Sequence, residues 1–101
     1  MKVNEMFPSK YIANGDLQGK DLTLTIGYVE MEDLGDGEKK PVLYFDGRNK
    51  GLVLNRTNTK RVASMHGNDT DGWIGQEITL YPTETEFKGD TVPCIRIRKT
   101  T

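Results

Sequence analysis

The chain has 101 residues, of which 29% are charged, and a formal net charge of -1. This length fits one domain with a single core. No stretch approaches the roughly 20 apolar residues of a membrane-spanning helix, and Met1–Tyr11 lacks the apolar centre of a signal peptide. One cysteine and one histidine exclude an internal disulfide and a Cys/His metal site. We therefore expect a cytoplasmic protein with no cofactor and no membrane contact.

The first half of the chain predicts an arm and three strands. Residues 1–16 show no hydrophobic period and are expected to form an N-terminal arm. Leucine and isoleucine alternate with threonine in the first half of Leu17–Met31, which predicts a strand. Gly27 interrupts this alternation, and a glycine inside a strand is typical of a bend or bulge. Shorter strands are predicted at Lys40–Asp46 and Gly51–Leu54.

The second half predicts one helix and two more strands. Asn55–His66 carries apolar residues at helical spacing, and an asparagine or threonine at its start can cap the first turn. The next strand is predicted at Gln76–Tyr81, where Pro82 is expected to break it or to mark a sheet edge. Val92–Arg98 alternates inward isoleucines with outward arginines and predicts the last strand.

The order of these elements is three strands, one helix and two strands. This order is typical of a five-stranded Greek-key OB-like barrel with one short helix between strands 3 and 4. A long first strand that bends can serve both halves of such a barrel. We therefore predict an OB-like barrel over residues 17–101, and this fold commonly binds single-stranded nucleic acid or oligosaccharide.

Charge is segregated along the chain in spite of the small net charge. Residues 30–38 form an acidic block, and residues 69–90 are acidic again. Between Gly47 and Asn68 there is no acidic residue, while five basic residues lie there: Arg48, Lys50, Arg56, Lys60 and Arg61. A solvated surface explains such a run, and so does a basic face that the net charge conceals.

Aromatic and basic residues meet around predicted strands 2 and 3, where the binding face of an OB-fold is centred. Tyr44 and Phe45 are neighbours on a strand, so one of the two rings is expected to face outward and to stack on a base. Arg48 and Lys50 follow in the next loop and are candidate phosphate contacts. The alternative is an ordinary amphipathic strand with one exposed ring.

Arg96 and Arg98 alternate with isoleucines on the last strand, so both guanidinium groups are expected on one outer face. There they are further candidates for phosphate contacts. The alternative is that these two arginines only solvate the surface of the sheet.

The remaining reactive residues are better explained by structural roles. Trp73 is expected to plug one end of the barrel, although stacking on a base is the alternative. His66 fits the end of the helix, where a cation is favoured, and Cys94 is expected to be buried and inert. No serine or cysteine has a discernible catalytic partner, and no phosphate-binding glycine loop is present. The sequence therefore predicts a protein that is not an enzyme.

Three segments carry a resemblance: Lys40-Pro-Val-Leu-Tyr-Phe-Asp46, the end of the predicted helix at His66-Gly67, and Asp71-Gly-Trp-Ile-Gly-Gln-Glu-Ile-Thr-Leu-Tyr-Pro82. Together they resemble small, poorly characterised phage and prophage proteins. The resemblance implies a phage setting, in which replication, recombination or counter-defence are the plausible roles. It assigns no site residue.

Our sequence-based hypothesis is a non-enzymatic module that binds single-stranded DNA or RNA in phage DNA replication or recombination. Its alternative is a protein-binding module or inhibitor that docks on a host or phage protein through an acidic loop and a sheet edge. Convergence of the four candidate basic residues beside a ring favours nucleic acid, whereas their dispersal together with an apolar patch favours a protein partner. The oligomeric state stays open.

Overall fold

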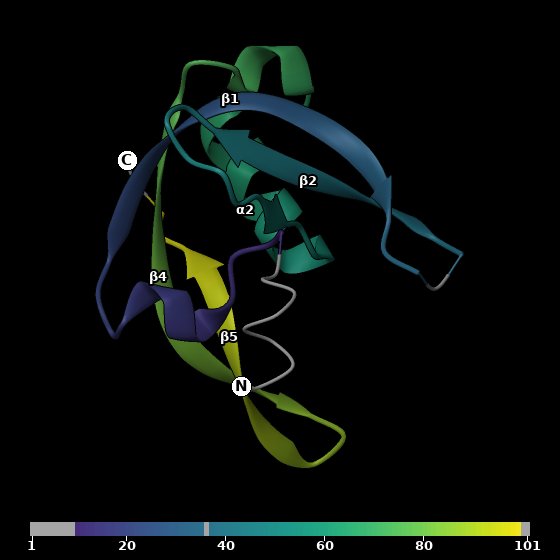
Figure 1. Ribbon diagram of the computed structural model, residues 1–101, viewed down its shortest axis with the longest axis vertical. Coiled ribbons are helices and arrows are strands. Elements are labelled where there is room, and N and C mark those ends of the chain that lie inside the picture. The colour runs from purple at the N-terminus through teal and green to yellow at the C-terminus, as the bar shows by residue number, and fades with distance from the viewer. Residues whose placement is uncertain (1–9, 36, 100–101) are drawn as a thin grey trace.

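The computed structural model describes residues 10–35 and 37–99. Its elements follow the predicted order, with α2 between β3 and β4 (Figure 1). They are the 3₁₀ turn η1 (Asn14–Leu17), β1 (Leu22–Asp33), β2 (Lys39–Phe45), β3 (Leu52–Val53), helix α2 (Arg56–His66), the 3₁₀ turn η2 (Thr70–Trp73), β4 (Glu77–Phe87) and β5 (Asp90–Ile97). The mostly β prediction with one short helix is therefore confirmed.

The five strands form one antiparallel sheet in the order β3-β2-β1-β4-β5. The first half of β1 pairs with β4, and the second half pairs with β2, so β1 joins the two parts of the sheet. The register shifts between Ile26 and Tyr28, where a Cβ on Gly27 would lie 2.6 Å from the Asp46 Oδ1 atom. The predicted bend at Gly27 is confirmed, and a side chain at this position would require the exposed Asp46 carboxylate to move aside.

The five strands form one open sheet, and the closed or nearly closed barrel that the element order predicted is not shown. In the described part of the chain, no backbone pairing joins β3 to β5, because β3 is only two residues long. Side chains span the gap instead. The Asn58 Nδ2 group donates to the Ile95 carbonyl at 2.9 Å, and the Asn14 Nδ2 group donates to the Cys94 carbonyl at 2.8 Å. These two amides satisfy carbonyl groups that a closed barrel would pair with another strand.

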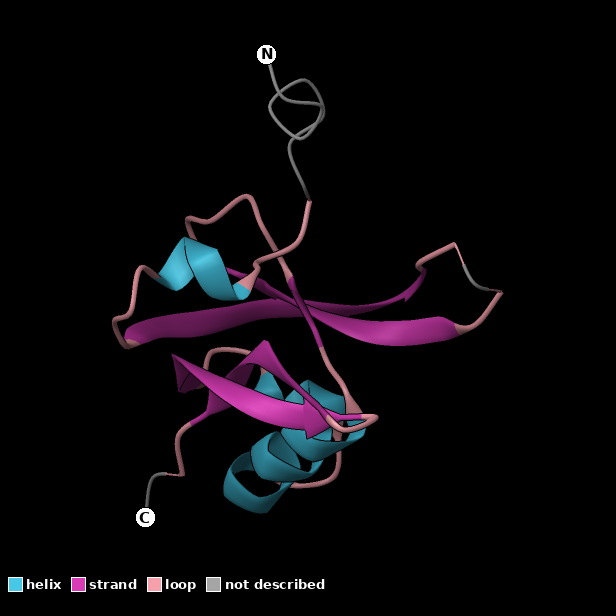
Figure 2. Ribbon diagram, turned by 90° about the horizontal axis from the view of Figure 1, so that it is seen from below, coloured by secondary structure: helices cyan, strands magenta, loops and turns pink. Residues whose placement is uncertain are grey.

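One apolar core lies between the sheet, η1 and α2. Its members come from every element and include Leu24, Ile26, Leu43, Phe45, Leu52, Leu54, Val62, Trp73, Ile78, Leu80, Ile95 and Ile97. Figure 2 shows η1 and α2 on opposite sides of the molecule, with strands between them. Trp73 is only 3% exposed, and its Nε1 group donates to the Gly67 carbonyl at 2.8 Å. The predicted structural role of Trp73 is confirmed.

The start of α2 agrees with the prediction, whereas β4 differs from it. Asn55 caps α2 by accepting from the Asn58 amide at 2.8 Å, as one of the predicted caps. The expectation that Pro82 breaks β4 is wrong, because β4 continues to Phe87. Pro82 pairs with Ile95 on one side, and β1 pairs with β4 only at Glu77–Leu80. Pro82 therefore lies at an edge, where its missing amide donor costs nothing.

The described part of the N-terminal arm lies against β3. The Ile12 amide donates to the Gly51 carbonyl at 2.8 Å, and the Gly51 amide donates to the Lys10 carbonyl at 3.1 Å. Leu17, where η1 ends, is buried in the core. Residues 10–17 thus pack on the domain, while residues 1–9 lie outside the described residues.

Candidate nucleic-acid interface

The two predicted stacking rings are both buried. Phe45 belongs to the core and is 4% exposed, so it faces inward. Tyr44 lies on the opposite, outer face of β2 but is still only 6% exposed. The expectation of an exposed ring at one of these two positions is therefore wrong, because the outer face of β2 is covered by other residues.

Tyr28 is the residue that covers Tyr44. The two rings are stacked across β1 and β2, with centroids 4.7 Å apart and an interplanar angle of 16°. Tyr28 itself is 51% exposed. The exposed ring on this face is thus on the neighbouring strand. The sequence does not show whether Tyr28 or Val29 faces outward, because the alternation of β1 is interrupted at Gly27. In the structure the bulge at Gly27 turns Tyr28 outward.

The Glu32 carboxylate binds three side chains on the outer face beside the stacked rings. Glu32 accepts hydrogen bonds from the hydroxyl groups of Tyr11, at 2.6 Å, and Tyr44, and it pairs with the Lys10 Nζ atom at 3.0 Å. The hydrogen bond from Tyr11, followed by those from Tyr44 and Lys10, lowers the pKa of Glu32 from 4.5 to about 2. Glu32 therefore stays ionised and fastens the N-terminal arm to β1 and β2.

Arg48 and Lys50 lie in the loop between β2 and β3, as expected. Lys50 forms an ion pair with Asp16 of η1 at 3.3 Å, whereas Arg48 is exposed and makes no ion pair with a described carboxylate. Both residues line a cleft of about 430 Å³ between this loop, η1 and the start of β1. The structure thus brings these two predicted residues together, although half of their charge is neutralised.

Arg96 lies on β5, and Arg98 follows directly after the end of this strand at Ile97. Arg98 forms an ion pair with Asp21 at 2.6 Å, and its guanidinium lies 4.2 Å from the ring centroid of Tyr81. The hydrogen bond from Arg98 lowers the pKa of Asp21. Arg96 is half-buried, and its Nη1 atom has no partner among the described residues. No hydrogen bond within the described part of the chain joins Arg96 or Arg98 to Arg48 or Lys50.

The larger set of unpaired cations lies on and beside α2. We call it the α2 basic surface, and its members are Lys40, Arg56, Lys60, Arg61 and Lys99. None of them forms an ion pair with a carboxylate in the described ranges. Lys40, Arg56 and Lys60 line one cleft of about 730 Å³ with Pro41 and Leu54, and Lys60, Arg61 and Lys99 line a second, of about 390 Å³.

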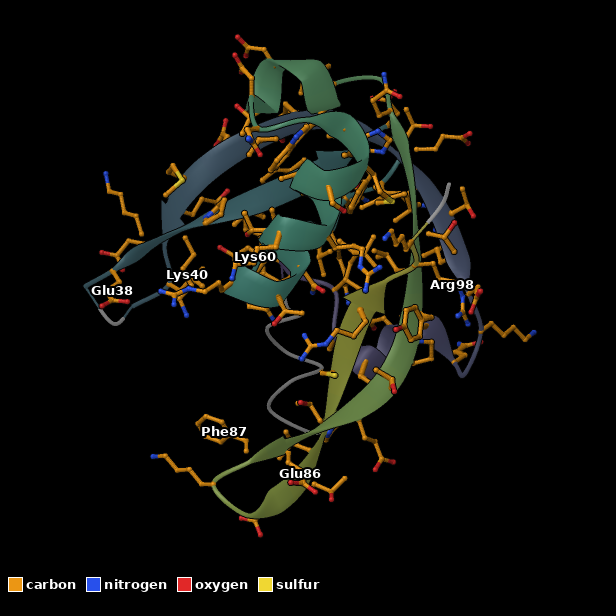
Figure 3. All side chains as sticks on the ribbon, turned by 180° about the vertical axis from the view of Figure 1, so that it is seen from behind. Glu38, Lys40, Lys60, Glu86, Phe87 and Arg98 are labelled. Atoms are coloured by element: carbon orange, nitrogen blue, oxygen red, sulfur yellow. The ribbon has the colours of Figure 1, made fainter. Side chains whose placement is uncertain are left out.

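Figure 3 shows Lys40 and Lys60 close together at one side of the molecule, with Arg98 at the other side. The sequence contained a signal for this surface, because Arg56, Lys60 and Arg61 belong to the acid-free run between Gly47 and Asn68. The contribution of Lys40 and Lys99 depends on the fold and was not expected.

The acidic residues gather on the two hairpins. Glu30, Asp33 and Glu38 lie towards the end of the β1–β2 hairpin, and Glu84, Glu86 and Asp90 lie on the β4–β5 hairpin. All six are exposed. Phe87, beside the β4–β5 turn, is 61% exposed. Within residues 10–35 and 37–99, no three His, Cys, Asp or Glu side chains are placed to hold a metal ion together.

No family profile, curated protein or solved structure matches this chain. Among the described residues, no helix is long and apolar enough to cross a membrane.

Proposed function

We propose that this protein is a non-enzymatic module that binds single-stranded nucleic acid, and that the α2 basic surface holds the phosphates. The observation that carries the proposal is the state of the cations. Lys10, Lys50 and Arg98 are each paired with a carboxylate, whereas the five members of the α2 basic surface form no ion pair with any carboxylate of residues 10–35 and 37–99. Cations that are free of internal partners can release counterions when they meet a polyanion, and this release drives non-specific binding.

The shape of the surface supports a strand rather than an isolated anion. Lys60 lines both clefts, so the five cations follow one continuous path along α2. The larger cleft has Pro41 and Leu54 in its wall, which offers apolar contact to a base beside the charged rim. Helix α2 itself contains no acidic residue. A strand on this path meets positive charge at successive phosphates.

Tyr28 offers a ring to the same strand. In the backbone register of β1 and β2, Tyr28 lies opposite Tyr44 and Glu32 lies opposite Lys40, so these positions share the outer face of the two strands. Four residues along a strand span about 13 Å, so the exposed ring lies a short distance from the edge of the α2 basic surface. Stacking on such a ring contributes about 1–3 kcal/mol per base and tolerates any sequence.

We assign the fold to a partly open OB-like barrel with Greek-key connections. Support comes from the strand order, from β1 serving both parts of the sheet, and from the amides of Asn14 and Asn58 that reach across the gap. Phage DNA replication or recombination in the cytoplasm is the setting that the resemblance implies. Arg48, Lys50, Arg96 and Arg98 stay predicted contacts, and Tyr44 and Phe45 contribute by supporting Tyr28 and the core.

A second candidate function is docking on a protein. Two observations favour it: the six predicted residues do not converge, and the β4–β5 hairpin carries an exposed Phe87 among acidic residues. Such a tip fits a basic partner protein with an apolar pocket. Nucleic acid and protein docking use different surfaces, so one set of variants separates them.

The test is a fluorescence anisotropy titration of a labelled single-stranded oligonucleotide at low salt. The double variant Lys60→Gln/Arg61→Gln is expected to bind at least about tenfold more weakly than the wild type, because two phosphate contacts are lost. The charge-matched control Lys20→Gln/Lys88→Asn removes two exposed lysines elsewhere and is expected to bind as the wild type does. Absence of wild-type binding, or equal loss in both variants, overturns the proposal and leaves protein docking.

A further inference from the structure

The cleft on the η1 side of the molecule is a separate site from the α2 basic surface. We call it the η1 cleft. Its lining has an aliphatic part, which we call its floor and which consists of Ile12, Leu17, Leu22 and Leu24, and a polar part, which we call its rim and which contains Arg48, Asn49 and the Lys50–Asp16 ion pair. Its volume of about 430 Å³ is in the range of pockets that hold one small ligand. Figure 2 shows η1 and α2 on opposite sides, so the two sites do not share a surface.

The side chains that line the η1 cleft indicate which class of ligand fits it. The floor offers no hydrogen-bonding side chain, so it favours a flat, apolar face such as that of a nucleobase. Lys50 and Asp16 neutralise each other at 3.3 Å, which leaves the charge of Arg48 in excess at the rim. An exposed arginine without an ion pair is suited to hold a phosphate with two parallel hydrogen bonds.

The two halves of the cleft therefore match the two halves of a nucleotide. We infer that the η1 cleft binds a single nucleotide unit, with the base on the aliphatic floor and the phosphate on Arg48. The Asn49 amide can donate to and accept from a base edge or sugar. This inference deepens the proposed function, because a free nucleotide unit is what a single strand presents at its end.

The probe is deoxyadenosine monophosphate, titrated into the isotope-labelled full chain and followed by amide chemical shifts. Saturable binding with a Kd of about 1 mM or tighter is expected, with shifts confined to Gly47–Lys50, η1 and the start of β1. Deoxyadenosine and inorganic phosphate, which each fill one half of the cleft, are expected to bind at least about tenfold more weakly, each losing about 1.4 kcal/mol or more.

Variants separate this site from the proposed function. Arg48→Gln, at an exposed loop position, is expected to weaken nucleotide binding at least about tenfold, whereas Lys60→Gln/Arg61→Gln is expected to leave it unchanged. Absence of saturation, shifts that map to α2, or an unchanged Kd in the folded Arg48 variant each overturns the inference. Nucleotide binding without oligonucleotide binding would support the η1 cleft and refute the proposed function, and the reverse result would do the opposite.

Discussion

Gly51 is the position where a single methyl group tests the packing of the N-terminal arm and the outer face of β2. A Cβ atom there would lie 2.7 Å from Val42 Cγ1, 2.9 Å from Tyr44 Cε1 and 3.0 Å from the Leu43 carbonyl oxygen. Carbon atoms in favourable contact are about 3.5–4.0 Å apart, so the overlap is roughly 1 Å at two atoms. Val42 is fully buried and Leu43 contributes backbone, so neither can move aside.

Gly51→Ala is therefore expected to cost about 1–3 kcal/mol of unfolding free energy, as overpacking of a filled interior does. In a domain of this size each kcal/mol lowers the melting temperature by about 4–8 °C. Thermal unfolding followed by circular dichroism measures the shift. Gly15→Ala is the matched control, since a Cβ at Gly15 meets no atom within 4 Å. A Gly51→Ala variant that melts within about 2 °C of this control would refute the packing argument.

Three further predictions concern single side chains. Trp73→Ala removes a buried ring and its hydrogen bond, and we expect the free energy of unfolding, measured by chemical denaturation, to fall by about 3–5 kcal/mol. Strong quenching of the wild-type Trp73 fluorescence by iodide would contradict its burial. Asn58→Ala leaves the Ile95 carbonyl without its donor and is expected to cost about 1–3 kcal/mol in urea unfolding; an unchanged midpoint would count against the amide bridge. Glu32 has a lowered pKa in the fold, so its stabilisation is present above pH 4.5 and is lost as the pH falls towards about 2. Glu32→Gln is expected to be less stable at pH 7 and to lose less stability than the wild type over that range, and parallel pH profiles of the two proteins would contradict this.

The element order and the bend were predictable because they depend on neighbouring residues. Alternation of leucine, isoleucine and threonine in β1, the glycine at its bulge and the asparagine cap of α2 are all local signals. The far half of β4 was missed for the same reason. Residues 83–86 alternate threonine and glutamate, so the segment has no hydrophobic period, and it pairs only with β5.

The candidate site was harder to predict, because it depends on residues that are distant in sequence. Asp21 neutralises Arg98 across 77 residues, and Asp16 neutralises Lys50 across 34. Neither pairing has a signal in the residues around the cation. The burial of Tyr44 likewise depends on Tyr28 from the next strand and on the arm residue Tyr11, whose hydroxyl shares the Glu32 carboxylate. The count of basic residues along the chain therefore identified the acid-free run. It did not identify which cations of this run form ion pairs with distant carboxylates.

The salt dependence of single-stranded DNA binding measures how many phosphates the α2 basic surface contacts. Each phosphate contact contributes about 0.7 to the slope of log K against log salt, so Lys60→Gln/Arg61→Gln is expected to flatten the slope by about 1.4 relative to the wild type. The control Lys20→Gln/Lys88→Asn is expected to keep the wild-type slope, and both variants are expected to melt as the wild type does, since all four side chains lie at the surface. No binding at low salt, or a wild-type slope in the Lys60/Arg61 variant, would contradict a phosphate-binding role for the α2 basic surface.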